Sequence, residues 1–185
     1  CTLQARAGMQ VTSRSETLDG DRQTLVQMLF VEGNHFCPSC EKSGDCMLQA
    51  VAYDLDIMSS ELDYMFPNRP VDASHPEILL DFNRCILCDL GINASREVDN
   101  KNVFALSGRG STKHLIVNAE SGRLADTDIA VTDKATQVCP VGVILHKGAG
   151  FRVPIGKRRF DLRAISDRAR EDAPGVVKDR RGEPS

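Results

Sequence analysis

His35-Phe-Cys-Pro-Ser-Cys-Glu-Lys-Ser-Gly-Asp-Cys46, or "HFCPSCEKSGDC", places three cysteines and a histidine within twelve residues. Such a cluster is typical of a disulfide knot, a zinc site or an iron–sulfur site. The chain has seven cysteines, and an odd number argues against a fully paired disulfide framework. Two thiolates spaced as in Cys37-x2-Cys40 can bind one centre, and Cys46 can fold back as a third ligand. This stretch therefore predicts a metal site, and its spacing alone leaves zinc and a 4Fe–4S cluster both open.

His35 is the candidate for the fourth ligand of this first site. No residue between positions 33 and 37 offers a better donor. The alternative is a surface histidine that merely stands beside a cysteine site. If His35 does bind, imidazole leaves one negative charge fewer than thiolate, so we expect it to raise the reduction potential of a cluster.

A second cysteine group consists of Cys85-x2-Cys88 and, 51 residues further on, Cys139-Pro140. A ligand cysteine followed by proline is common in iron–sulfur proteins, whereas zinc ribbons tend to repeat the C-x2-C pair. The alternative is that Cys88 and Cys139 are buried core thiols. The combination of "CILC" with "CPVG" favours a second iron–sulfur site.

Composition restricts the class of protein. Of the 185 residues, 41% are apolar and 26% are charged, and the net charge is −3. This balance suits a globular protein and gives no argument for binding nucleic acid or an anionic membrane. We find no apolar run long enough to cross a bilayer and no signal-peptide pattern, so we expect a reducing, cytoplasmic location. Aromatic residues make up only 5%, and such a modest core commonly depends on metals.

The hydrophobic pattern predicts a mixture of helices and strands. We expect helices over residues 18–33, where Gly33 ends the pattern, over about 46–57, from the "RCILC" segment to about 98, and over 132–139, where Thr132 is the expected cap. Residues 102–110 and 113–119 read as a hairpin. The segments without a predicted element are a short strand or turn region at 1–17, a proline-rich linker at 66–76 and a charged tail from 156 to 185.

Three segments, "FVEGNHFCPSCEKSGDCMLQA", "RCILC" and "CPVGVIL", together resemble the small iron–sulfur subunit of the diaphorase part of soluble NAD-reducing nickel–iron hydrogenases. The same module is similar to the N-terminal part of the large iron–sulfur subunit of complex I and of NAD-dependent formate dehydrogenases. The resemblance covers roughly residues 1–160. It implies one 4Fe–4S cluster on a first set of ligands and a second cluster on another. The first set is His35, Cys37, Cys40 and Cys46, and the second is Cys85, Cys88 and Cys139.

The sequence departs from this family at three places. The histidine stands two residues before the first cysteine, whereas in complex I it stands four before. Cys1 matches the last cysteine of the family's 2Fe–2S domain, and alone it cannot hold a cluster. The family's second site reads C-x2-C-x2-C, but its third place is Gly91 here. The second centre is then expected to be 3Fe–4S, or a 4Fe–4S cluster completed by water, Asp89 or Asn93.

The resemblance implies an α+β fold, in which a small cluster-stabilised helical domain precedes a ferredoxin-like α+β domain. The expected units are a 2Fe–2S domain remnant (1–17), the His/Cys3 iron–sulfur domain (18–65), a linker (66–76), the ferredoxin-like iron–sulfur domain (77–160) and a charged tail (161–185).

The expected function is electron relay between a flavin- and NAD-binding diaphorase subunit and a hydrogenase or formate dehydrogenase subunit, with no catalytic residues in this chain. We favour the hydrogenase, because the sequence continues only briefly beyond the second site. The competing hypothesis is a zinc-stabilised protein-interaction module without redox activity. No nucleotide-binding motif, nucleic-acid partner or membrane partner is expected.

Several other residues have less specific interpretations. Methionines at 47, 58 and 65 are expected to pack rather than to bind metal. Histidines at 75, 114 and 146 have no neighbouring cysteines in the sequence, and we expect surface or capping roles for them. The basic run from 157 to 159 reads as a solvated face that could dock an acidic partner.

Overall fold

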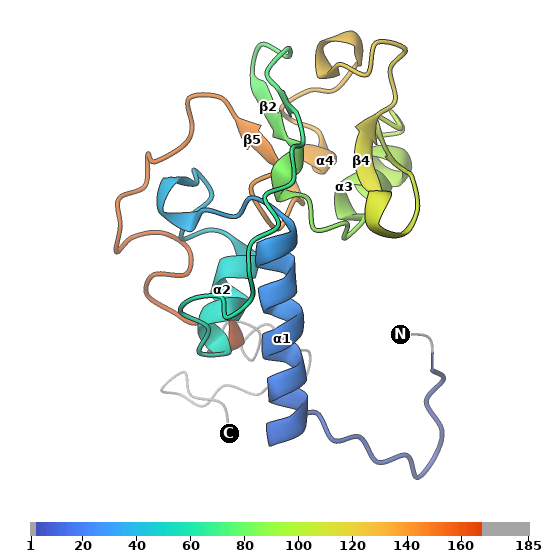
Figure 1. Ribbon diagram of the computed structural model, residues 1–185. Helices are drawn as coiled ribbons and strands as arrows, with labels where there is room; N and C mark the ends of the chain where they lie inside the picture. Colours follow the sequence, from blue (N-terminus) through green and yellow to red (C-terminus); the bar gives the residue numbers. More distant parts are fainter. Residues whose placement is uncertain (1–2, 168–185) are drawn as a thin grey trace, which may run out of the picture.

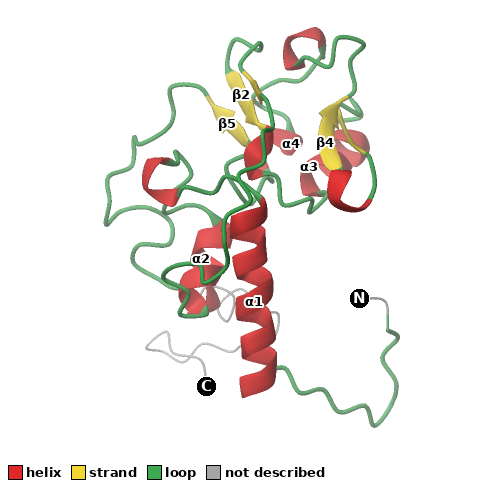
Figure 2. Cartoon of the chain, in the orientation of Figure 1, coloured by secondary structure: helices red, strands yellow, loops and turns green. Residues whose placement is uncertain are grey.

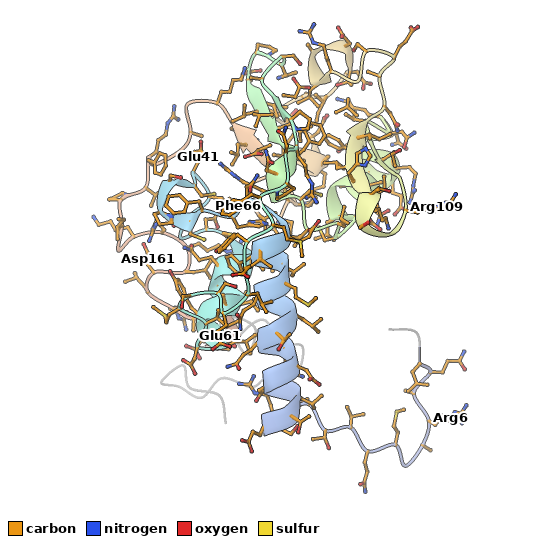
Figure 3. The ribbon with its side chains drawn as sticks, viewed as in Figure 1. Arg6, Glu41, Glu61, Phe66, Arg109 and Asp161 are labelled. Carbon is orange, nitrogen blue, oxygen red and sulfur yellow. The ribbon has the colours of Figure 1, made fainter. Side chains whose placement is uncertain are left out.

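The computed structural model describes residues 3–167, and its mixture of helices and small antiparallel sheets confirms the predicted α+β class. Helix α1 (Glu16–Glu32) forms a column with helix α2 (Met47–Asp54) beside it, and the sheets lie beyond its C-terminal end (Figure 1). Long loops connect these elements (Figure 2). The segment before α1 runs away from the rest of the chain and carries Arg6 outward (Figure 3).

Helix α1 begins two residues before the predicted start, because Ser15 caps it. The Ser15 hydroxyl accepts the backbone N–H of Leu18 at 3.2 Å, which satisfies one free donor of the first turn. The helix ends before Gly33, as predicted. Its partly or fully buried apolar side chains are Val26, Leu29, Phe30 and Val31.

Helix α2 confirms the second predicted helix, although it stops three residues earlier than expected. It starts directly after Cys46 and buries Leu48, Ala50 and Ala52. The N–H of Met47 in its first turn donates to the carbonyl of Pro140 at 2.8 Å. The first half of the chain is thereby tied to the segment that follows Cys139.

A three-stranded antiparallel sheet joins β1 (Val71–Asp72), β2 (Ile78–Asp81) and β5 (Ile144–His146), with β2 in the centre. Ile78 and Leu80 on β2 are completely buried. The sequence analysis missed this sheet, and β1 lies inside the segment expected to be only a linker. The strands are too short to show an alternating pattern of apolar and polar residues, so the local sequence did not predict them.

The predicted hairpin is confirmed as β3 (Phe104–Ser107) paired with β4 (His114–Val117). The chain turns at Gly108, which has φ +75° and so a conformation that favours glycine. The predicted helix after "RCILC" is α3 (Leu90–Asn93), which continues as a π-turn over Ala94–Val98.

Helix α4 (Lys134–Gln137) is shorter than predicted. The expectation that Thr132 caps it is wrong. Asp133 holds the N-cap position, and the first backbone N–H groups of α4 donate instead to the carboxylate of Asp99, at 2.8 Å from Lys134 and 2.9 Å from Ala135. A distant carboxylate thus satisfies donors that the sequence pattern assigned to a local cap.

The main core lies between the sheets and α3, and its fully buried members are Ile78, Leu80, Phe104, Leu124 and Val141. Within residues 3–167, no helix has the length and apolar character needed to cross a bilayer. The predicted orphan thiol Cys1 and the tail beyond residue 167 lie outside the described residues.

Candidate iron–sulfur centres

The cysteines of the first site stand on a short loop between α1 and α2. Cys37 begins a single 3-10 turn (Cys37–Ser39), and the N–H of Cys40 closes that turn on the Cys37 carbonyl at 3.2 Å. Cys46 is buried at the start of α2. Its thiol is close enough to those of Cys37 and Cys40 for their charges to interact. The structure therefore brings all three predicted cysteines of this site together.

His35 presents a nitrogen that has no partner. Its Nε2 is buried and makes no hydrogen bond within the described residues. Burial, reinforced by the nearby Arg84 guanidinium, lowers the pKa of His35 to about 4. The imidazole is therefore neutral near pH 7, with a lone pair available. An unsatisfied buried nitrogen is costly unless a ligand uses it.

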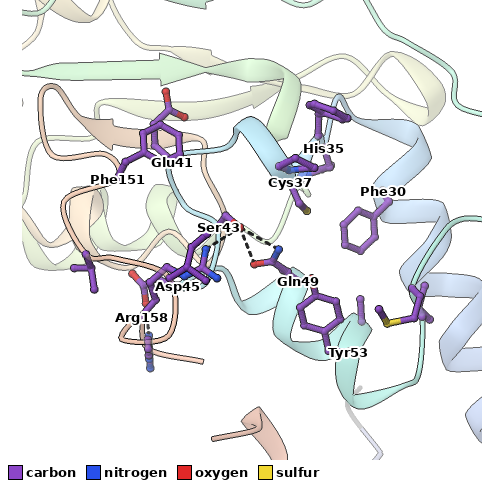
Figure 4. Close-up of a pocket in the computed structure, with 18 of the residues that line it drawn as sticks. Phe30, His35, Cys37, Glu41, Ser43, Asp45, Gln49, Tyr53, Phe151 and Arg158 are labelled. Atoms are coloured by element: carbon purple, nitrogen blue, oxygen red, sulfur yellow. Dashed lines mark hydrogen bonds and ion pairs between the residues drawn. The ribbon is translucent and has the colours of Figure 1, made fainter. Parts of the chain in front are cut away.

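One open cavity of about 1230 Å³ is lined by both His35 and Cys37. Figure 4 shows these two side chains and Phe30 near one another, with Gln49 on α2 below them in this view. The Phe30 and His35 rings meet edge to face, with centroids 5.7 Å apart. The cavity therefore offers open space beside the unpartnered imidazole of His35 and the thiol of Cys37.

The thiols of Cys37 and Cys46 are protonated near pH 7 when no metal is bound. Burial raises the pKa of Cys46 to about 11, and burial also raises the pKa of Cys37. Metal ligation requires the thiolate, so cluster binding must release these protons. Within residues 3–167, no three His, Cys, Asp or Glu side chains lie close enough to surround one metal ion. Cysteines of a multi-iron cluster bind different irons and stand further apart than the donors of a single zinc ion.

The turn between Cys40 and Cys46 is covered by a C-terminal segment. Arg158 lies across Gly44 and donates to the Ser43 hydroxyl at 3.3 Å, while Asp161 holds its guanidinium at 2.7 Å. The N–H of Phe160 also donates to the Gly44 carbonyl at 2.9 Å. Arg158 is only 22% exposed, so the expectation of a solvated basic run is wrong at this residue.

Gly44→Ala should destabilise the first site. Gly44 has φ +79°, and a methyl group there would collide with the Arg158 side chain. We expect a loss of about 1–3 kcal/mol, measured by denaturant unfolding. Gly122→Ala is the matched control, because Gly122 has φ +69° and open space around it. Equal losses in the two variants would show that the Arg158 contact contributes nothing.

The second group of cysteines converges between the sheets and α3. Cys85, Cys88 and Cys139 line one apolar cavity, and their thiols are close enough to influence one another. Leu87 and Asp89, on either side of Cys88, have φ of 54° and 60°. Such strained residues cluster at ligand-holding loops. The alternative of fully buried core thiols does not fit Cys88, which is exposed.

Gly91 lines the same cavity as these three cysteines. A side chain there would meet only Ile144 at 3.7 Å and the Ala135 carbonyl at 3.9 Å, so the position has room for a larger residue. Asp89 also lines the cavity, but Asn93 does not. The Asn93 side-chain oxygen instead accepts from Arg96 at 3.0 Å. Among the expected substitutes for the missing ligand, the geometry favours Asp89 or water over Asn93.

The remaining residues singled out in the sequence take other roles. Met47, Met58 and Met65 are exposed, so they do not pack in the core, and the expectation that they do not bind metal stays a prediction. His75 does cap a turn, since its Nδ1 accepts the N–H groups of Glu77 at 3.2 Å and Ile78 at 3.1 Å. The side chains of His114 and His146 lie on the surface, as expected.

His35→Ala should weaken or abolish the first centre, whereas His35→Cys should keep it and lower its reduction potential, because thiolate adds a negative charge. Electron paramagnetic resonance during a redox titration measures both effects. His114→Ala is the control, since that histidine is exposed on β4. An unchanged signal, potential and stability in His35→Ala would show that His35 is not a ligand.

Two protein-family models match the two sites separately. The "NADH-ubiquinone oxidoreductase-G iron-sulfur binding region" matches residues 22–61, and the "4Fe-4S single cluster domain" matches residues 78–145. The first range contains the first site and the second range contains the second. These matches indicate 4Fe–4S binding regions in both halves of the chain, without fixing the type of cluster in the second.

Curated relatives also indicate an iron–sulfur protein of an NAD(P)-linked oxidoreductase. The chain is 38% identical over 172 residues to NAD-reducing hydrogenase HoxS subunit gamma of Cupriavidus necator, covering 92% of this chain and 73% of that protein. It is 28% identical to NADPH-Fe(3+) oxidoreductase subunit alpha of Geobacter sulfurreducens, covering 82% of this chain but 18% of that protein. A crystal structure of NAD+-reducing [NiFe]-hydrogenase in the H2-reduced state matches with a TM-score of 0.86 and 53% identity, covering 91% of this chain and 73% of that one.

These relatives confirm the predicted resemblance and the hydrogenase context, and they set the zinc-module hypothesis aside. The chain is an iron–sulfur protein of an electron-transfer family whose members also include the G subunits of complex I. It belongs to the family of gamma subunits of NAD-reducing hydrogenases.

Proposed function

We propose that this chain passes electrons one at a time through two iron–sulfur centres within an NAD-linked hydrogenase complex. The first centre would be a 4Fe–4S cluster held by His35, Cys37, Cys40 and Cys46. The second would be a 3Fe–4S or 4Fe–4S cluster held by Cys85, Cys88 and Cys139. Bound there, such clusters supply one-electron chemistry, while the protein sets their spacing, burial and hydrogen bonds.

The observation that carries this proposal is the link between the two ligand groups. Met47, which follows Cys46, donates its N–H to the carbonyl of Pro140, which follows Cys139, at 2.8 Å. One hydrogen bond and a few covalent bonds therefore connect a ligand of one centre to a ligand of the other. An electron relay needs centres held close together, and this hydrogen bond ties the first group of proposed ligands to the second.

The proposed partners are a flavin- and NAD-binding diaphorase subunit on one side and a hydrogenase subunit on the other, in the cytoplasm. The Cupriavidus relative is a subunit of an NAD-reducing hydrogenase, which supports this pairing. Surface chemistry agrees, because grouped exposed apolar side chains mark contact sites for other proteins. Met58, Phe151 and Ile155 are exposed and line one open cavity.

Anaerobic purification followed by iron, sulfide and zinc analysis tests this proposal. We expect a brown protein that contains iron and acid-labile sulfide, with no stoichiometric zinc. Each centre should then be lost separately, the first in Cys46→Ser and the second in Cys139→Ser. A colourless protein that contains zinc would overturn the proposal.

A further inference from the structure

Arg84 adjoins the second candidate centre in sequence, and its side chain contacts the first. It ends a short 3-10 turn (Phe82–Arg84) and directly precedes Cys85. Its side chain, however, points to the first site, where Nη1 lies 3.5 Å from the sulfur of Cys40. Only 17% of the Arg84 side chain is exposed. A guanidinium so well covered, beside a candidate cluster ligand, is not a solubilising surface charge.

Three groups hold the guanidinium in this position. Nε pairs with the Asp81 carboxylate at 2.8 Å, and Nη1 donates to Glu41 at 3.0 Å and to the Gly142 carbonyl at 3.4 Å. A Cβ at Gly142 would lie 3.1 Å from both the Arg84 Nη1 and the Cys40 sulfur. The absence of a side chain at Gly142, three residues after Cys139, therefore lets the guanidinium and the sulfur approach.

The charge on Arg84 is permanent. A guanidinium stays protonated in proteins, and the carboxylates of Asp81 and Glu41 pair with it here. The planar guanidinium directs its donors in a fixed geometry, which a lysine ammonium cannot reproduce. Arg84 thus places a fixed donor and a positive charge at the sulfur of Cys40.

We propose that Arg84 tunes the first centre, raising its reduction potential by donating to the Cys40 sulfur. The inference rests on the proposed function, because it requires Cys40 to be a cluster ligand. One electron entering the centre adds one negative charge, and both a hydrogen bond to sulfur and a nearby cation favour the more negative state. Arg84 is a positioning and tuning residue, since it acts through Cys40 and not on a substrate.

Loss of Arg84 should have a larger effect than loss of one charge at a distance. The carboxylates of Asp81 and Glu41, which pair with Arg84, would remain near the first site without their counter-ion, and both disfavour an added electron. Arg84→Gln should therefore lower the potential of the first centre, and Arg84→Lys should lower it less. The second centre in the same protein provides an internal reference.

Redox titration of the full chain in its complex, followed by electron paramagnetic resonance, tests the proposal. The matched control is Arg69→Gln, because Arg69 is similarly covered, at 18% exposed, and pairs with Glu32. Arg69 makes no hydrogen bond to a sulfur among the described residues. We expect a larger downward shift in Arg84→Gln than in Arg69→Gln, and a smaller shift at the second centre than at the first.

An unchanged first-centre potential in Arg84→Gln would overturn the inference and leave the proposed function intact. If the unmodified protein has no cluster signal that depends on His35 and Cys40, the proposed ligands and the inference both fail. Glu41→Gln gives an independent test should Arg84→Gln not fold. It removes a counter-carboxylate and keeps the donor, so the potential should rise, and a fall or no change would overturn the inference.

Discussion

Gly91→Cys should convert the second site into a stable four-iron centre. The position lies in the cavity lined by Cys85, Cys88 and Cys139, and it has room for a side chain. Among residues 3–167, the Asp89 carboxylate is the candidate ligand for the remaining iron of this proposed site, with water as the alternative. Oxygen donors bind iron less tightly than thiolate, so that iron should be labile and the centre should be isolated mainly as 3Fe–4S.

The measurement is Mössbauer or electron paramagnetic resonance spectroscopy on both proteins as isolated, with the rate of iron loss to a chelator. A direct ligand should slow that loss by more than the roughly 10–100-fold that an outer-shell partner contributes. Gly91→Ala is the control, because it fills the space without adding a ligand. An unmodified second site that already shows four irons with thiolate ligation throughout would contradict this prediction.

Removal of iron should unfold the first site before the rest of the protein. Of the residues from 35 to 45, only Gly44 is buried, and Phe36 is 68% exposed. A loop without apolar burial has little of its own to offset the entropy of ordering, so bound metal supplies the missing stability. We expect amide hydrogen exchange over about residues 34–60 to accelerate by roughly 100-fold, equivalent to ~3 kcal/mol of local stability.

Strand β2 is the internal control for this experiment, because it contains no cysteine, lines neither cavity, and its Ile78 and Leu80 are completely buried. Within residues 34–60, the loop should lose more protection than α2, since Leu48 on α2 belongs to the main core. Equal protection of the loop with and without iron would show that the metal is not structural there.

The elements that could be predicted from the sequence are those that depend on neighbouring residues in the chain. Helix α1 and the β3–β4 hairpin follow from periodicity and turn residues, and the cysteine groups follow from their spacing. The β1–β2–β5 sheet was not predicted because its strands are two to four residues long and because β2 pairs with β5 from far along the chain. The roles of Arg84 and Arg158 were not predicted either. Each contacts the loop from Cys37 to Cys46 only because the tertiary fold brings distant segments together.

The hydrogen bond from Met47 to Pro140 joins two segments that are synthesised at different times. Ligands of the first centre emerge from the ribosome within twelve consecutive residues, whereas Cys139 follows Cys88 by 51 residues. That longer segment contains the β3–β4 hairpin, and long-range contacts form late. The cysteines proposed for the first centre are thus all synthesised long before Cys139. The Met47 N–H receives its acceptor only when Pro140, the residue after the last proposed ligand, has been added.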